Sequence, residues 1–228
     1  MLSAIVLAAG SSRRMGNANK LLLPYKDRPV IAHTVESILA AGIEQIIVVT
    51  GHQSQQIAQA LTGLPVRLTH NSHYEEGMTG SIQAGVLATA GQTTPLPAAV
   101  RTPLPATAPS GAVPPVAAPS TSLGYMICLS DMTLITPEEY RLLAQAFETR
   151  YLSDEYCILL PEYNGQKGNP VIFSSLYKEV ILQHEEKEGC KKIVRTNSKH
   201  VHPVSMPSDH ILRDIDSPED YRALTLNS

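Results

Sequence analysis

Short apolar runs alternate with amphipathic segments along most of the 228-residue chain. A continuous apolar run is typical of a strand buried on both faces, and apolar positions three or four residues apart are typical of a helix packed on a sheet. The runs predict strands over 4–8, 46–49, 66–68, 125–129, 156–160 and 170–173. The helical spacing predicts helices over 29–41, 53–61, 79–90 and 137–149, and a capped helix that starts at Ser217-Pro218-Glu219-Asp220. This alternation predicts one α/β domain, with a mostly parallel sheet and helices on both faces.

The alternation is interrupted between residues 91 and 124. These 34 residues contain eight prolines and one charged residue, Arg101, and they follow neither helical nor strand periodicity. Such a segment buries too little apolar surface to offset the entropy of ordering it. We therefore expect a disordered insertion within a single domain of residues 1–228. A tolerated surface insertion is favoured over a functional tether.

Charge and composition exclude several classes of protein. The chain has 18 basic and 21 acidic residues, which argues against nucleic-acid binding through bulk charge. No apolar run is long enough to cross a membrane, and the first apolar run lacks the preceding basic residues of a signal peptide. We therefore expect a cytoplasmic protein. Cys128, Cys157 and Cys190 are far apart in the sequence, which predicts inert buried thiols rather than disulfides.

The loop after the first predicted strand carries the strongest chemical signal. It reads Gly10-Ser11-Ser12-Arg13-Arg14-Met15-Gly16, and Lys20 follows closely. Ligands of parallel sheets bind beyond the carboxyl ends of the strands, where glycines let backbone N–H groups approach a phosphate and cations neutralise it. The glycine spacing fits neither the P-loop nor the dinucleotide fingerprint. The loop predicts a polyphosphate site, with a solvated polar loop as the alternative.

Six motifs occur in order along the chain. They are Leu7-Ala8-Ala9-Gly10 with Arg14-Met15-Gly16 and Lys20-Leu21-Leu22-Leu23-Pro24; Val49-Thr50-Gly51-His52; His70-Asn71 with Tyr74, Gly77-Met78 and Ser81-Ile82; Leu129-Ser130-Asp131-Met132; Gly168-Asn169-Pro170-Val171; and Arg213-Asp214-Ile215-Asp216-Ser217-Pro218-Glu219-Asp220. Together they resemble the molybdenum cofactor nucleotidyltransferase family, in particular its CTP:molybdopterin cytidylyltransferases. The resemblance spans the chain outside 91–124 and implies a fold like that of nucleotide-diphospho-sugar transferases. Thr133 departs from the family's proline after Asp-Met, and Lys20 follows Gly16 by four positions where some members have three.

The resemblance implies an activity and a set of site residues. CMP would pass from CTP to the phosphate of the molybdenum-loaded molybdopterin cofactor, with release of pyrophosphate. Arg14, Lys20 and Asp131 would be catalytic, and Mg²⁺ would be held by Asp131 with Asp214, or with Asp216 as the alternative. The side chains of Asp214 and Asp216 are expected to face opposite ways along a strand, so that only one of them reaches the ion. A molybdenum hydroxylase would receive the product. The implied nucleotide contacts are Leu7, Ala8, Ala9, Gly10, Arg14, Lys20, Asn71, Gly77 and Ser81, and the pterin side would be shaped by Gly168, Asn169 and Pro170.

Several alternatives stay open. The resemblance implies glycine in place of Ala9 in relatives that transfer GMP. The Cβ of Ala9 narrows the space for a purine, which favours CTP over GTP by about 1–3 kcal/mol. Asn71 also suits a simple turn. The other functions considered are transfer of another nucleotide, transfer to a sugar phosphate, and a non-catalytic molybdopterin carrier. A solvated face is favoured for Lys191, Lys192, Arg195 and Lys199 over a phosphate site, and surface histidines are favoured over zinc ligands for His200 and His202.

Overall fold

The computed structural model describes residues 1–16, 18–90 and 122–226. Residues 91–121 of the expected insertion lie outside this description. Ser122 and Gly124, which fall at the end of the expected insertion, are buried in the described structure. Ser122 Oγ accepts a hydrogen bond from Ser3 Oγ at 2.8 Å, and Gly124 begins a central strand. The core therefore resumes at Ser122.

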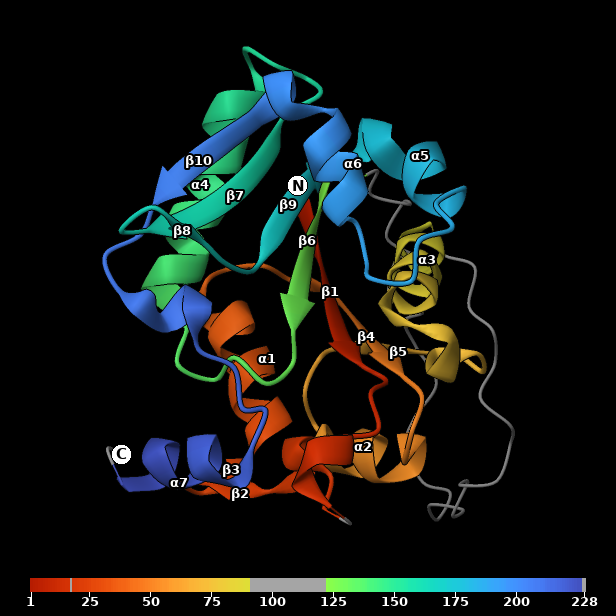
Figure 1. Cartoon of the computed structure of the whole chain (residues 1–228), viewed down its shortest axis with the longest axis vertical. Coiled ribbons are helices and arrows are strands. Elements are labelled where there is room, and N and C mark those ends of the chain that lie inside the picture. Colours follow the sequence, from red (N-terminus) through yellow and green to blue (C-terminus); the bar gives the residue numbers. More distant parts are fainter. Residues whose placement is uncertain (17, 91–121, 227–228) are drawn as a thin grey trace, which may run out of the picture.

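One mixed sheet forms the centre of the described chain (Figure 1). Its order is β10-β7-β9-β6-β1-β4-β5, with β8 paired to β7. Neighbours are parallel except for β9, which is antiparallel to β6 and β7, and β8, which is antiparallel to β7. The strands are β1 (Leu2–Ala8), β4 (Gln45–Thr50), β5 (Arg67–His70), β6 (Gly124–Leu129), β7 (Ile158–Tyr163), β8 (Gln166–Lys167), β9 (Val171–Ser174) and β10 (Val201–Ser205), and a separate hairpin joins β2 (Pro24–Tyr25) to β3 (Arg28–Pro29).

Helices cover both faces of this sheet, as the sequence predicts. The helices are α1 (Val30–Ala40), α2 (Ser54–Ala60), α3 (Met78–Thr89), α4 (Pro137–Tyr151), α5 (Lys178–Leu182), α6 (Lys191–Thr196) and α7 (Pro218–Leu226). Short 3₁₀ turns are η1 (Arg13–Met15), η2 (Lys20–Leu22), η3 (Tyr74–Glu76), η4 (Ser175–Tyr177), η5 (Ser198–His200) and η6 (Asp209–Leu212). Side chains alternate along β1, so Ala4, Val6 and Ala8 pack in one core with α1 and α4, whereas Ile5 packs in the other with α3.

Helix α3 approaches the sheet closely because of Gly85. A Cβ on that residue would lie 2.3 Å from Ile5 Cγ2. This close contact seats α3 against β1, and its first turn stands beside the carboxyl end of that strand. No helix in the described residues is long and apolar enough to span a bilayer.

Candidate active site

A pocket of about 500 Å³ lies beyond the carboxyl ends of β1 and β6. This is the edge at which open parallel sheets bind ligands. Seven of the nucleotide-site residues expected from the sequence line it, together with Asp131: Leu7, Ala9, Gly10, Arg14, Lys20, Gly77 and Ser81. Asp216 also lines the pocket. The structure therefore brings together residues that are up to 209 positions apart, from Leu7 to Asp216.

The loop after β1 is closed by its own side chains. Asn19 Oδ1 accepts a hydrogen bond from Ser12 Oγ at 3.4 Å and from Leu21 N–H at 3.1 Å. Ser12 Oγ in turn accepts from Lys20 N–H at 3.3 Å. A Cβ on Gly10 would meet nothing within 4 Å, so the backbone there is open to a ligand. The loop thus delivers Lys20 to the pocket beside an exposed stretch of backbone.

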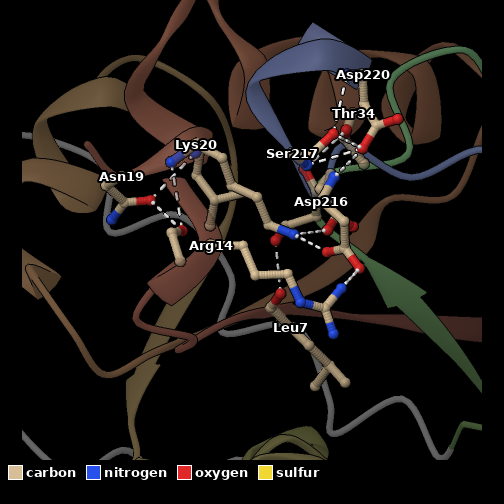
Figure 2. A network of polar contacts seen from close by, with 12 residues as sticks. Leu7, Arg14, Asn19, Lys20, Thr34, Asp216, Ser217 and Asp220 are labelled. Carbon is tan, nitrogen blue, oxygen red and sulfur yellow. Dashed lines mark hydrogen bonds and ion pairs between the residues drawn. The ribbon is translucent and has the colours of Figure 1, made fainter. Parts of the chain in front are cut away.

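Four charged side chains meet at the mouth of this loop, and Figure 2 labels three of them, Arg14, Lys20 and Asp216. Lys20 Nζ lies 2.5 Å from Asp131 Oδ2 and 2.8 Å from Asp216 Oδ1, and Arg14 Nη1 lies 2.5 Å from Asp216 Oδ2. Burial lowers the pKa of Lys20, but Asp131 and Asp216 outweigh burial and leave the pKa above its usual value. The hydrogen bond from Lys20 holds the pKa of Asp216 below its usual value. Both groups are therefore charged at neutral pH.

Asp131 is positioned by the end of β6. Ser130 Oγ donates to the carbonyl of Leu7 at 2.6 Å, and the carbonyl of Ser130 accepts from Thr34 Oγ1 of α1 at 3.1 Å. These bonds tie the end of β6 both to β1 and to the helix beneath it. The side chain of Asp131 is consequently buried and fixed at the pocket floor.

Asp214 and Asp216 both reach Asp131. One carboxylate oxygen from each of the three residues lies within 4.8 Å of the others. The expectation that only one of the pair approaches is wrong, because it took the two side chains to face opposite ways. Positions two apart in a strand share a face, and residues 213–216 form no strand. Burial, followed by Asp216 and Asp131, raises the pKa of Asp214. Converging carboxylate oxygens are the ligands that Mg²⁺ prefers, so these residues fit a divalent cation.

The opposite wall of the pocket is the start of α3. Ser81 Oγ, which lines the pocket, accepts a hydrogen bond from Asn71 Nδ2 at 3.0 Å. Asn71 Oδ1 accepts from His73 N–H at 3.0 Å, which is the bond of a turn residue. Asn71 and Ala8 do not line the pocket; the Ala8 side chain packs in the core on the α1 face. The structure thus places these two expected contacts one layer behind the site.

A second and larger pocket of about 1260 Å³ adjoins the first, and Met78 and Leu129 line both. Its walls are mainly apolar, and four cations stand among them: Lys167, Lys187, Lys191 and Arg195. Gly168 and Asn169, expected on the acceptor side, line it, whereas Pro170 is buried behind them. Lys191, Lys192, Arg195 and Lys199 are exposed, as expected for a solvated face. Lys191 and Arg195 also line this pocket, and Lys192 pairs with Glu186 at 3.0 Å.

One wall of this second pocket is the segment of residues 183–190, which sequence reasoning did not identify. Gln83 Nε2 of α3 donates to the carbonyls of Ile181, Leu182 and His184 at 2.9–3.1 Å. Met78 N–H donates to the carbonyl of Lys187 at 2.9 Å. Gly77 has a φ of +132°, and a Cβ there would lie 2.6 Å from the same carbonyl. The glycine of the Gly77-Met78 motif was the available signal for this close contact.

The histidines and cysteines stand apart from both pockets except for Cys190. His200 Nδ1 and His202 Nε2 both contact the carboxylate of Asp154, at 2.9 and 2.8 Å. They are therefore half-buried partners of a carboxylate rather than free surface histidines. The three cysteines are free and buried, as predicted. Burial raises the pKa of Cys157 to about 11 and that of Cys190 to about 12, so these thiols are protonated at neutral pH.

A phosphate-suited loop faces carboxylates at the carboxyl ends of the parallel strands. This combination of fold and site defines a nucleotidyltransferase-type protein. The chain belongs to the family of the MobA-like NTP transferase domain, which it matches over residues 4–204. This match covers most of the described sheet and the lining of both pockets except Asp216.

Solved structures with the same fold include a nucleotidyl transferase from Methanothermobacter thermautotroptrophicus and a cytidylyltransferase from Leptospira borgpetersenii. The first is 20% identical, with a TM-score of 0.75 over 100% of this chain and 97% of that one. The second is 14% identical, with a TM-score of 0.69 over 98% of this chain and 84% of that one. At these identities the likeness shows the fold alone.

Curated relatives match over shorter stretches. The nicotine blue oxidoreductase of Paenarthrobacter nicotinovorans is 31% identical over 84 residues, which is 37% of this chain and 41% of that protein. The bifunctional protein GlmU of Halorhodospira halophila is 42% identical over 66 residues, which is 28% of this chain and 14% of that protein. The chain therefore aligns with less than half the length of these relatives.

Proposed function

We propose that this protein transfers CMP from CTP to a phosphate group of the molybdopterin cofactor, with release of pyrophosphate. The observation that carries the proposal is the adjacency of two unlike pockets. One combines a phosphate-suited loop with carboxylates, and the other is mainly apolar with cations among its walls. A nucleoside triphosphate suits the first, and a flat heterocycle that bears a phosphate suits the second.

The nucleotide-binding part of the proposal rests on the loop after β1 and on Ala9. Arg14 and Lys20 can neutralise the triphosphate, and the backbone at Gly10 is open for close approach. The buried side chain of Ala9 lines the same pocket and narrows it on the side of β1. The extra bulk of a Cβ favours a pyrimidine over a purine, which is the argument for CTP.

The acceptor half rests on the second pocket. Its lining includes Val171, Phe173 and Val201, which suit an apolar ring, and Lys191 and Arg195, which suit a phosphate. Met78 and Leu129 stand at the boundary between the pockets. A phosphate that reaches from the second pocket to this boundary approaches the triphosphate held in the first.

The reaction proposed is an in-line displacement at phosphorus. An oxygen of the acceptor phosphate forms a bond to the α-phosphorus of CTP, the bond to the β-phosphate oxygen breaks, and pyrophosphate leaves with the electron pair. The protein's work is positioning and charge neutralisation. Lys20 and Arg14 would leave their carboxylate partners to hold the phosphates. Asp131, with Asp214 and Asp216, would hold Mg²⁺, which when bound supplies charge neutralisation of the triphosphate.

The test measures pyrophosphate release from CTP, GTP, ATP and UTP with Mg²⁺, with and without molybdenum-loaded molybdopterin. Release from CTP that requires the pterin is expected. Asp131→Asn is expected to abolish release while the fold survives, and Asp27→Asn, at an exposed site in the described structure, is the matched control. Preference for GTP, or transfer to a sugar phosphate, moves the protein to another nucleotidyltransferase activity. Pterin binding without release from any nucleotide leaves a carrier and overturns the proposal.

A further inference from the structure

The carboxylate of Glu139 has more partners than its place in helix α4 requires. Glu139 is 3% exposed and closes a capping box, in which its Oε2 accepts from Thr136 N–H at 2.8 Å. A capping box needs no more than this bond and its reciprocal. Glu139 Oε1 also accepts from Ser208 Oγ at 2.6 Å, and Oε2 also contacts His210 Nδ1 at 2.9 Å. One buried carboxylate therefore joins α4 to turn η6, about seventy residues away in the sequence.

These two elements carry the two halves of the carboxylate cluster. Helix α4 follows β6 after the short turn that contains Asp131. Turn η6 leads directly into the loop that carries Asp214 and Asp216. The bonds of Glu139 consequently link the backbone that holds the first carboxylate to the backbone that holds the other two.

Packing between these backbones is incomplete. A pocket of about 630 Å³ lies beside the turn after β6 and the loop after η6, and Thr133, Leu134, His210 and Asp214 are among its lining residues. Elements that border open volume depend on a few specific bonds for their spacing. The far end of the carboxylate loop is held separately, because Asp216 N–H and Ser217 N–H donate to Asp220 Oδ2 at 3.1 and 2.8 Å.

We propose that Glu139 is a positioning residue for the divalent cation site, which sets the distance between Asp131 and the loop of Asp214 and Asp216 through its bonds to Ser208 and His210. The inference rests on the proposed function only for the presence of a metal. Burial raises the pKa of Glu139, but hydrogen bonds from Ser208, from Thr136 N–H and from His210 outweigh burial and leave the pKa below its usual value. A charged carboxylate accepts these bonds more strongly than a neutral one.

The substitution Glu139→Gln separates the two roles of this residue. Glutamine also serves at this position of a capping box, so the helix start is kept. Its amide cannot accept from both Ser208 and His210. Outer groups that orient metal ligands typically contribute 10–100-fold to metal affinity. We therefore expect the dissociation constant for Mn²⁺, measured by electron paramagnetic resonance with Mn²⁺ alone, to rise by about tenfold.

Two further substitutions make the test specific. Thr136→Ala removes the hydroxyl half of the capping box and leaves Glu139 bonded to η6, so it is expected to lower the melting temperature and keep Mn²⁺ affinity within about twofold. His210→Asn, which offers a donor in place of Nδ1, is expected to retain more of the affinity than His210→Leu. Hydrogen exchange of the peptide 208–217 is expected to quicken in Glu139→Gln and not in Thr136→Ala.

Each outcome decides something. Unchanged Mn²⁺ affinity in Glu139→Gln, or an equal loss in Thr136→Ala, overturns the positioning role and leaves the proposed transfer reaction intact. Absence of Mn²⁺ binding to the unaltered protein, both alone and with α,β-methylene CTP, overturns the cation site itself. The Mn²⁺-alone measurement does not depend on the choice of nucleotide or acceptor, so a failed transfer assay is not confused with a failed positioning role.

Discussion

The ammonium group of Lys20 lies between the carboxylates of Asp131 and Asp216, 2.5 Å from the first and 2.8 Å from the second. It thus occupies the space between two of the three carboxylates that fit a divalent cation. Two cations cannot share that space without strong repulsion. Binding of a metal therefore requires that Lys20 withdraws, and a bound triphosphate offers it an alternative anionic partner.

The first prediction follows for Lys20→Met. We expect Mn²⁺ to bind several-fold more tightly in the absence of nucleotide, because the competing cation is gone. We also expect nucleotide turnover to be lost, because the triphosphate loses its lysine. Mn²⁺ titrations with and without CTP measure the first effect, and pyrophosphate release measures the second. Lys26→Met, at an exposed lysine over the Tyr25 ring, is the matched control. Unchanged or weaker Mn²⁺ binding in Lys20→Met contradicts the competition.

The second prediction concerns pH and Asp214. Burial and the neighbouring carboxylates of Asp216 and Asp131 raise the pKa of Asp214 above its ordinary 3.8. A carboxyl with a raised folded pKa opposes folding once the pH exceeds that pKa. Asp214→Asn is therefore expected to stabilise the metal-free protein at pH 7, by about 1 kcal/mol at most because the carboxylate is exposed. Thermal unfolding is expected to show this as a rise of at most about 2–4 °C, which disappears as the pH falls towards 3.8.

Asp216→Asn provides the matched control with the opposite sign. The hydrogen bond from Lys20 lowers the pKa of Asp216, so its charge stabilises the fold above pH 3.8. The variant is expected to melt below the unaltered protein at pH 7, and the difference shrinks as the pH falls through the lowered pKa. Two variants that shift the melting temperature in the same direction would refute the electrostatic account of the cluster.

The buried strands and the first loop could be predicted because their signals are local. Apolar runs predicted β1, β4 and β6 to within about two residues, and the glycine and cation pattern singled out a loop that lines the first pocket. Strand β10 has no such run, because Pro203 and Ser205 are exposed at the sheet edge, and its pairing with β7 depends on tertiary context. The joint approach of Asp214 and Asp216 depends on an irregular loop, for which no sequence period exists.

The third prediction concerns the wall of the second pocket. The side-chain amide of Gln83 donates to the backbone carbonyls of Ile181, Leu182 and His184. Gln83→Leu removes these bonds. The Ile181 carbonyl keeps the bond from His184 N–H, whereas the loss of the donor to Leu182 and His184 is expected to cost about 1–3 kcal/mol. We expect faster hydrogen exchange over residues 183–190 and a several-fold rise in KM for the acceptor, with little change in KM for CTP. Gln59→Leu, at an exposed position of α2, is the control. Equal rises in both KM values would indicate a general loss of structure rather than a role in the acceptor pocket.

The fourth prediction concerns nucleotide choice at Ala9. Its side chain is 4% exposed and lines the nucleotide pocket, and a Cβ on Gly51 behind it would lie only 2.9 Å from the Ala9 Cβ. The backbone of Gly51 therefore lies close behind the Ala9 methyl group, which lines the pocket. Ala9→Gly is expected to reduce the preference for CTP over GTP in kcat/KM by about tenfold, within the range that one buried methyl group supplies.

Ala8→Gly separates this effect from added backbone freedom. The neighbouring Ala8 side chain packs in the core on the α1 face, so its removal is expected to lower the melting temperature and leave the ratio of CTP to GTP turnover unchanged. Competition between the two nucleotides in one assay measures the ratio directly. An equal fall in the ratio for both variants would mean that loop flexibility, and not the space at Ala9, governs the choice of base.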